Sequence, residues 1–68
     1  MLKISLKAAR VNANLSQKKA AEELGVSNNT LGDWENGKSY PKVDKIPAIC
    51  ELYGVEYDNI IFLPNDSL

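Results

Sequence analysis

The 68-residue sequence has no histidine and only one cysteine, Cys50. A single cysteine excludes an internal disulfide, and without histidine the chain lacks the four ligands of a structural zinc site. The sequence also has no glycine-rich phosphate loop and no cysteine–base pair that would favour catalysis. A domain this small has little room for a pocket. We therefore expect a protein that is not an enzyme, with no metal, no cofactor and no small-molecule ligand.

Long apolar stretches are also missing. The longest runs over residues 60–63, far short of the ~20 residues of a membrane-spanning helix. Residues 1–10 lack the apolar segment of a signal peptide, and the use of cysteine suits a reducing compartment. We therefore expect a cytoplasmic protein that does not bind membranes.

Charge is unevenly distributed along the chain. The net charge is −1, yet all eight Lys and Arg residues precede residue 46, and so do five of the nine acidic residues, which gives 8 − 5 = +3. The remaining residues carry four acids and no base, which gives −4. Such a distribution can present a basic face to an anionic partner although the whole chain is acidic. A solvated surface with a chance asymmetry explains the counts equally well.

Capping residues and the spacing of apolar residues predict one domain over residues 1–68, built from short helices. A chain of this length supports a single small core, and 44% hydrophobic with 25% charged residues is typical of a folded domain. We expect helices at about 2–12, 17–24, 28–36, 43–53 and 57–63, with 64–68 as a loose tail.

The segment of about residues 16–36 has the pattern of a helix-turn-helix. Ser16 is a suitable N-cap for the first of its helices, and Gly25 suits the left-handed backbone at its end. Ser27 is a second N-cap only two residues later. Two helices joined by so short a turn are typical of DNA-binding proteins, in which the second helix enters the major groove.

Polar side chains at the start of this second helix are candidates for reading bases. Asn can pair with adenine N6 and N7, the methyl group of Thr can contact that of thymine, and Asp can accept from cytosine N4. A solvated helix start is the alternative explanation. The candidates for base contact are Asn28, Asn29, Thr30 and Asp33, and those for the phosphate backbone are Gln17, Lys18, Ser27, Asn36, Lys38 and Lys42.

Three motifs carry a resemblance to a known family. Gln17 is followed by A-x-x-L-G-V-S at residues 21–27 and by W-E-N-G-K at residues 34–38. With these motifs the chain resembles the lambda-repressor-like (Cro/C1, XRE) family, especially its small phage and prophage repressors, over residues 6–62. The resemblance implies a compact all-α fold of five helices, with the helix-turn-helix formed by helices 2 and 3. It also implies binding to an inverted-repeat operator in double-stranded DNA as a homodimer.

The resemblance assigns roles to particular residues. Gln17, Asn28, Asn29 and Asp33 match base- and phosphate-facing positions, Asn36 and Lys38 match a loop that contacts the DNA backbone, and Arg10 with Glu35 matches a buried structural ion pair. The chain departs from the family at Gly32, inside the recognition helix, and at Asp33, where such helices often carry Gln or Arg. It lacks the C-terminal dimerisation and cleavage domain of large repressors, so we expect a stand-alone regulator.

Two questions stay open at this point. The apolar residues Ile61, Phe62 and Leu63 either complete the core or form part of a dimer face. The same fold could also serve as a protein-interaction module, such as the antitoxin of a toxin–antitoxin pair.

Overall fold

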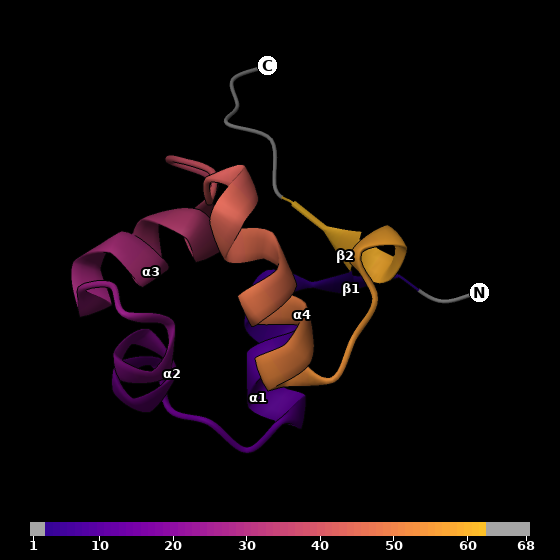
Figure 1. Cartoon of the computed structure of the whole chain (residues 1–68), viewed down its shortest axis with the longest axis horizontal. Helices are drawn as coiled ribbons and strands as arrows, with labels where there is room; N and C mark the ends of the chain where they lie inside the picture. The colour runs from indigo at the N-terminus through magenta and orange to yellow at the C-terminus, as the bar shows by residue number, and fades with distance from the viewer. Residues whose placement is uncertain (1–2, 63–68) are drawn as a thin grey trace.

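A computed structural model describes residues 3–62 as a small helical domain with one short pair of strands (Figure 1). Within these residues the elements are β1 (Ile4–Ser5), α1 (Leu6–Asn12), α2 (Gln17–Leu24), α3 (Asn28–Asn36), the 3-10 turn η1 (Val43–Lys45), α4 (Ile46–Tyr53), the 3-10 turn η2 (Tyr57–Asn59) and β2 (Ile60–Ile61). The predicted tail at 64–68 lies outside the described residues.

The prediction of five helices is wrong, because residues 57–61 form η2 and β2 instead of a helix. β2 pairs in parallel with β1, with Ile4 opposite Ile60 and Ser5 opposite Ile61. Isoleucine is β-branched and suits an extended backbone. Ile60 points into the core whereas Ile61 is exposed, which is the two-residue alternation of a strand.

The first and fourth α-helices are shorter than predicted. α1 begins at Leu6 instead of near residue 2, because Ser5 has an extended backbone and its hydroxyl accepts a hydrogen bond from the Ala8 N–H at 3.1 Å. α4 begins at Ile46, and η1 forms the turn before it. Pro47 has no N–H and is tolerated in the first turn of an α-helix, which is its position in α4.

The core is formed where α1 and α2 each pack against α3 and α4 (Figure 1). Small side chains bring the helices close together, since Ala9 and Ala20 are completely buried. The larger buried apolar residues are Leu6, Leu24, Leu31, Trp34, Ile49, Tyr53 and Ile60. No helix in the described part of the chain is long and apolar enough to cross a membrane.

An ion pair joins α1 to α3 inside this core. The Arg10 Nε donates to Glu35 Oε2 at 2.6 Å and the Arg10 Nη2 donates to Glu35 Oε1 at 3.3 Å. Their side chains are 9% and 2% exposed. The Arg10 Nη1 donates to the Leu15 carbonyl at 2.8 Å, so the same guanidinium also fixes the linker between α1 and α2.

Tyr53 of α4 is buried in the core and is close enough to this ion pair for both charges to affect the pKa of its hydroxyl. The pKa of Tyr53 is raised to about 12, chiefly by burial and in addition by the negative charge of Glu35, while the positive charge of Arg10 acts in the opposite direction. The Tyr53 hydroxyl is buried and has no hydrogen-bond partner among the described residues. The folded protein therefore favours the neutral phenol.

Titration of this hydroxyl is expected to lower the stability only at high pH. The pKa of Tyr53 is about 12 in the folded protein against an ordinary value of 10.0, so the free energy of unfolding is unaffected below pH 10 and falls between pH 10 and 12. At pH 11 the loss amounts to about 1 kcal/mol.

Urea denaturation of wild type and Tyr53→Phe at pH 7 and pH 11 measures this effect. Phenylalanine keeps the ring and removes the buried hydroxyl, so at pH 7 the variant is expected to be as stable as wild type or up to ~1 kcal/mol more stable. At pH 11 the difference in favour of the variant should grow by about 1 kcal/mol. Equal losses in both proteins would contradict the raised pKa.

Candidate nucleic-acid interface

α2 and α3 form the predicted helix-turn-helix, and local hydrogen bonds define its boundaries. The Ser16 hydroxyl accepts from the Lys19 N–H at 3.0 Å, and the Ser27 hydroxyl accepts from the Thr30 N–H at 3.0 Å. Gly25 ends α2 with a φ of 74°, a left-handed conformation that glycine adopts without strain. These caps confirm the limits predicted for both helices.

The turn between α2 and α3 is also held from α4's side of the molecule. The Lys45 Nζ donates to the Leu24 carbonyl at 2.8 Å, at the C-terminal end of α2 where a positive charge is favourable. The two helices are thus fixed to the rest of the domain at this end.

A series of hydrogen bonds connects the buried ion pair to the start of α3. The Gln17 Nε2 donates to Glu35 Oε1 at 3.0 Å, and the Asn28 Nδ2 donates to Gln17 Oε1 at 3.0 Å. Gln17 and Asn28 are the first residues of α2 and α3. The first turns of the two helices are therefore joined through their side chains.

Gly32, the glycine inside α3 that departs from the family pattern, lies beside Gln17. A Cβ added at this glycine would lie 3.6–3.8 Å from atoms of the Gln17 carboxamide, an ordinary contact distance. Packing within the chain therefore does not require glycine at this position.

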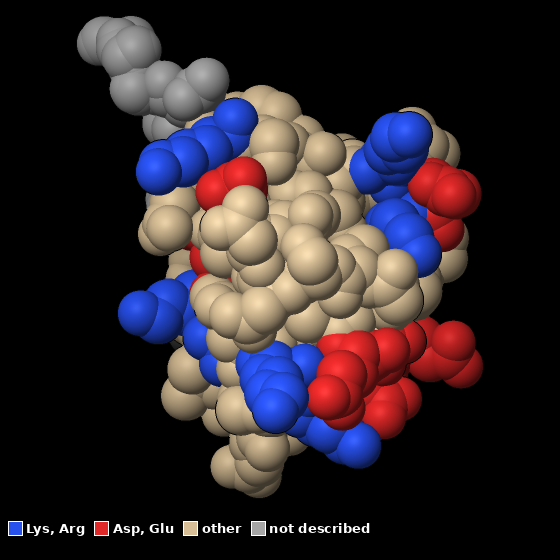
Figure 2. All heavy atoms as spheres, turned by 90° about the vertical axis from the view of Figure 1, so that its left-hand side faces the viewer, with Lys and Arg blue, Asp and Glu red and all other residues tan. Residues whose placement is uncertain are grey.

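Three of the predicted base-reading residues, Asn28, Asn29 and Thr30, lie in the first turn of α3, and Asp33 lies one turn further on. Asn28 and Asn29 are exposed, whereas Thr30 and Asp33 are partly buried. The Ser27 hydroxyl donates to Thr30 Oγ1 at 2.9 Å, so both hydroxyls are already engaged. Figure 2, which faces the side of α2 and α3, shows a broad uncharged centre bordered by basic and acidic side chains, with the largest acidic group at the lower right.

The predicted phosphate-contacting residues lie at both ends of this side. Lys18 is exposed in the first turn of α2, and Gln17 is partly buried beside it. Asn36 and Lys38 are exposed where α3 ends, and Lys42 is exposed just before η1. Basic groups therefore flank α3 at both of its ends, while Arg10 and Glu35 are inside the core.

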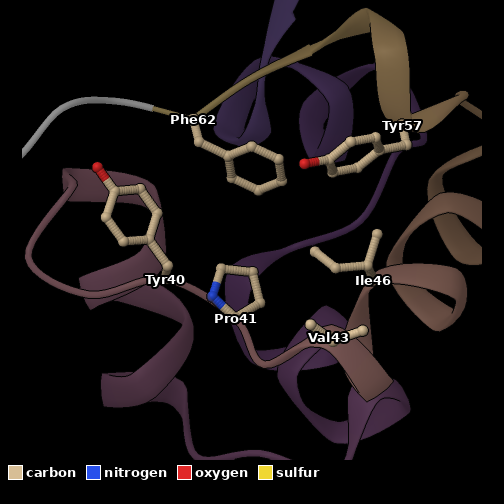
Figure 3. A pocket seen from close by; sticks show the side chains of 6 residues that line it. All are labelled: Tyr40, Pro41, Val43, Ile46, Tyr57 and Phe62. Carbon is tan, nitrogen blue, oxygen red and sulfur yellow. The ribbon is translucent and has the colours of Figure 1, made fainter.

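A shallow apolar groove lies between the loop after α3 and the C-terminal part of the chain. Tyr57 and Phe62 line one wall, their rings 6.0 Å apart, and Tyr40 approaches Phe62 edge-on at 6.5 Å from the opposite side (Figure 3). The groove has a volume of about 370 Å³, and its lining is completed by Pro41, Val43 and Ile46.

Sequence reasoning found only part of this groove. Of the predicted dimer-face residues, Phe62 lines the groove, Ile61 is 43% exposed, and Leu63 lies outside the described residues. Val43, 86% exposed, is the most exposed large apolar side chain of the described part and was missed. Its isolation among polar neighbours in the sequence was the available signal.

Comparisons with known proteins agree with the geometry of α2 and α3. Residues 6–60 match the helix-turn-helix family. The chain is 34% identical over 56 residues to the transcriptional activator BcrR of Enterococcus faecalis, matching 82% of this chain and 28% of BcrR. It is 33% identical over 61 residues to the antitoxin PezA of Streptococcus pneumoniae, matching 90% of this chain and 39% of PezA.

A third relative matches over its whole length. The uncharacterized HTH-type transcriptional regulator MJ0272 of Methanocaldococcus jannaschii is 34% identical over 66 residues, which is 97% of this chain and 100% of MJ0272. The chain thus spans less than half of BcrR and PezA but all of MJ0272. No solved structure matches with significance. On the family match over residues 6–60 and the helix-turn-helix seen in α2 and α3, the chain belongs to the helix-turn-helix family of the Cro/C1 type.

Proposed function

We propose that this protein is a transcriptional regulator that binds double-stranded DNA sequence-specifically, with α3 in the major groove. The observation that carries the proposal is the exposed start of α3, where the carboxamides of Asn28 and Asn29 are open to solvent. This side of the molecule has a broad uncharged centre with basic side chains at its border (Figure 2). Relatives named as transcriptional regulators support it. Such a protein acts in the cytoplasm and needs no catalytic group, metal or cofactor.

Two sets of residues contact different parts of the DNA. Those at the start of α3 read base edges, because the N-terminal end of a recognition helix faces them in the groove. The flanking residues hold the phosphates and set the orientation without adding sequence preference. The base-reading set is Asn28, Asn29, Thr30 and Asp33, and the phosphate set is Gln17, Lys18, Ser27, Asn36, Lys38 and Lys42.

The protein binds as a homodimer to an inverted repeat whose half-sites are about 34 Å apart. The groove of Figure 3 is the surface by which two copies meet. A two-fold interface uses the same patch on both copies. That patch must therefore carry both a protruding side chain and a hollow that receives the same side chain of the other copy. The 86% exposed Val43 stands beside a hollow lined by Ile46 and Tyr57, which meets this requirement.

A protein-interaction module is the second candidate, because the antitoxin PezA is among the relatives. In that case the groove of Figure 3 would hold a different protein. A phage-type repressor is our preferred form of the regulator, since the motifs at residues 21–27 and 34–38 resemble those of small phage repressors.

Selection of bound sites from random duplex DNA at near-physiological salt tests the proposed function. We expect an inverted repeat with half-sites about 10 bp apart, centre to centre. Recovery of no sequence above background would contradict DNA reading and favour the protein-interaction module.

Asn29→Ala should weaken binding to the selected site by roughly 1–3 kcal/mol and relax the preference at one base pair. Asn29 is exposed in the first turn of α3, so the loss removes a base contact and no packing. Fluorescence anisotropy on the site and on its single-base variants measures both effects. Asn12→Ala, which removes an exposed asparagine from α1, is the control. Unchanged binding by Asn29→Ala would remove this residue from the base-reading set.

Lys38→Ala should weaken binding to all sequences alike, because a phosphate contact releases counterions without reading bases. The slope of log K against log salt should become shallower by about one unit. Lys3→Ala is a matched control, since Lys3 precedes β1 on the opposite side of the molecule from α3 (Figure 1). A salt slope identical to that of wild type would show that Lys38 does not contact phosphate.

Val43→Asn should weaken binding to the complete inverted repeat while leaving binding to an isolated half-site unchanged. A neutral replacement avoids repulsion by the DNA, and the exposed Val43 contributes little to the monomer's core. The affinity for the complete inverted repeat should fall roughly tenfold. Titration of both duplexes with the protein measures the two affinities. Val11→Asn changes a 53% exposed valine of α1 and is the control. Equal weakening on both duplexes would contradict a dimer face at Val43.

A further inference from the structure

Gly32 lies in the middle of the exposed face of α3. The residues of this helix that are buried against the domain are Leu31, Trp34 and Glu35. Gly32 is partly exposed on the other face, one turn after Asn28 and one turn before Asn36. The proposed base-reading residues therefore lie around a position that has no side chain.

The chain itself gives no reason for a glycine at this position. Glycine is less favourable than alanine inside a helix, because its backbone loses more conformational freedom on folding. The left-handed backbone that favours glycine is found at Gly25, Gly37 and Gly54 but not at Gly32. The nearest atoms that a Cβ at Gly32 would meet belong to the Gln17 carboxamide, 3.6–3.8 Å away, which is ordinary contact. Neither backbone conformation nor packing requires the glycine, which leaves contact with a partner as the reason for it.

A helix fits closely into the major groove of DNA. With its side chains an α-helix is about 10–12 Å across, and the major groove of B-DNA is about 12 Å wide. The residues at the centre of the inserted face therefore set how near the helix backbone comes to the base edges. Without a Cβ, the Cα of Gly32 can come nearer to a base by up to one carbon–carbon bond length, ~1.5 Å.

The surface that Gly32 offers to a base is apolar. The backbone N–H and C=O of a residue inside an α-helix are used in the hydrogen bonds of the helix, so only the CH₂ group of the Cα is left for a contact. The apolar group that a base pair presents in the major groove is the C5-methyl group of thymine. A methyl carbon packs against another carbon at about 3.5–4.0 Å, and a Cβ at Gly32 would take up this space.

We propose that Gly32 is a specificity-determining residue, whose Cα forms the contact surface for a thymine methyl group. The proposal rests on the proposed function and adds to it one base pair in each half-site, at which the protein prefers thymine because of its methyl group. Gly32 is one turn after Asn28 and directly before Asp33, so this thymine lies next to the base pairs that these two residues read. Alanine at position 32 would hold α3 away from the methyl group.

Deoxyuridine in place of thymidine tests the contact from the side of the DNA, because it removes the methyl group and keeps every hydrogen-bonding group of the base. Each thymine of the selected inverted repeat is replaced in turn, in both half-sites together, and the affinity is measured by fluorescence anisotropy. At the position that Gly32 contacts, wild type should bind roughly tenfold more weakly, the loss expected for two buried methyl groups. We refer to this position as the responsive thymine.

Gly32→Ala is the matching change in the protein, since it adds one methyl group on the other side of the contact. On the selected site this variant should bind roughly tenfold more weakly than wild type. With deoxyuridine at the responsive thymine it should bind at least as tightly as with thymidine, because the Cβ fills the space of the missing methyl group. Urea denaturation should give a higher midpoint for Gly32→Ala than for wild type, so unfolding does not explain the weaker binding. Ala48→Gly, at an exposed position of α4, is the control and should leave the response to deoxyuridine as in wild type.

The outcomes separate the role of Gly32 from the proposed function. Binding of the selected site by Gly32→Ala as tightly as by wild type would overturn this role, and so would a loss that is the same with thymidine and deoxyuridine at every position. A selected half-site without thymine would overturn the methyl contact as well. In these three cases sequence-specific binding persists and the proposed function stands. Selection of no sequence at all would instead contradict the proposed function, and the role of Gly32 with it.

Discussion

The pairing of Arg10 with Glu35 inside the core is the constraint on which the rest of the structure depends. Charges removed from water are tolerated only when they are paired and hydrogen-bonded, and removing one partner costs ~3–5 kcal/mol. Arg10 of α1 and Glu35 of α3 bind each other and are also hydrogen-bonded to other segments. Arg10 donates to the Leu15 carbonyl of the linker, and Glu35 accepts from Gln17 of α2. The requirement of two buried charges therefore sets how the helix-turn-helix docks on the domain, and it extends to the side chains at the start of α3.

How far the sequence predicts this fold depends on the range of the interactions involved. The limits of α2 and α3 could be predicted, because Ser16, Gly25 and Ser27 act on the backbone within a few residues of themselves. The end of the described chain could not, because β2 exists only through its pairing with β1, and Ile60 lies 56 positions after its partner Ile4. An apolar run such as residues 60–63 fits a helix or a buried strand equally well when its partner is unknown.

In the candidate site, too, local features could be predicted from the sequence and contacts between distant segments could not. Motifs and resemblance predicted which residues would surround α3, including the two members of the ion pair, since residue type and spacing carry that information. They did not predict that Gln17 bridges Glu35 and Asn28, because this bond depends on how closely the first turns of α2 and α3 approach. Nor did they predict the groove of Figure 3, which is formed by residues from the loop after α3, from η1 and α4, and from the C-terminal part.

The most direct test of the account is to map the DNA contact surface by NMR, by adding a selected duplex to labelled protein and following backbone and side-chain amides. The account predicts that the largest shift changes occur at residues 17–18, 27–30 and 36–38, with the Gln17 and Asn28 carboxamides among them. Small changes there, with large changes confined to another surface such as the strand pair β1–β2, would contradict the claim that the start of α3 reads DNA.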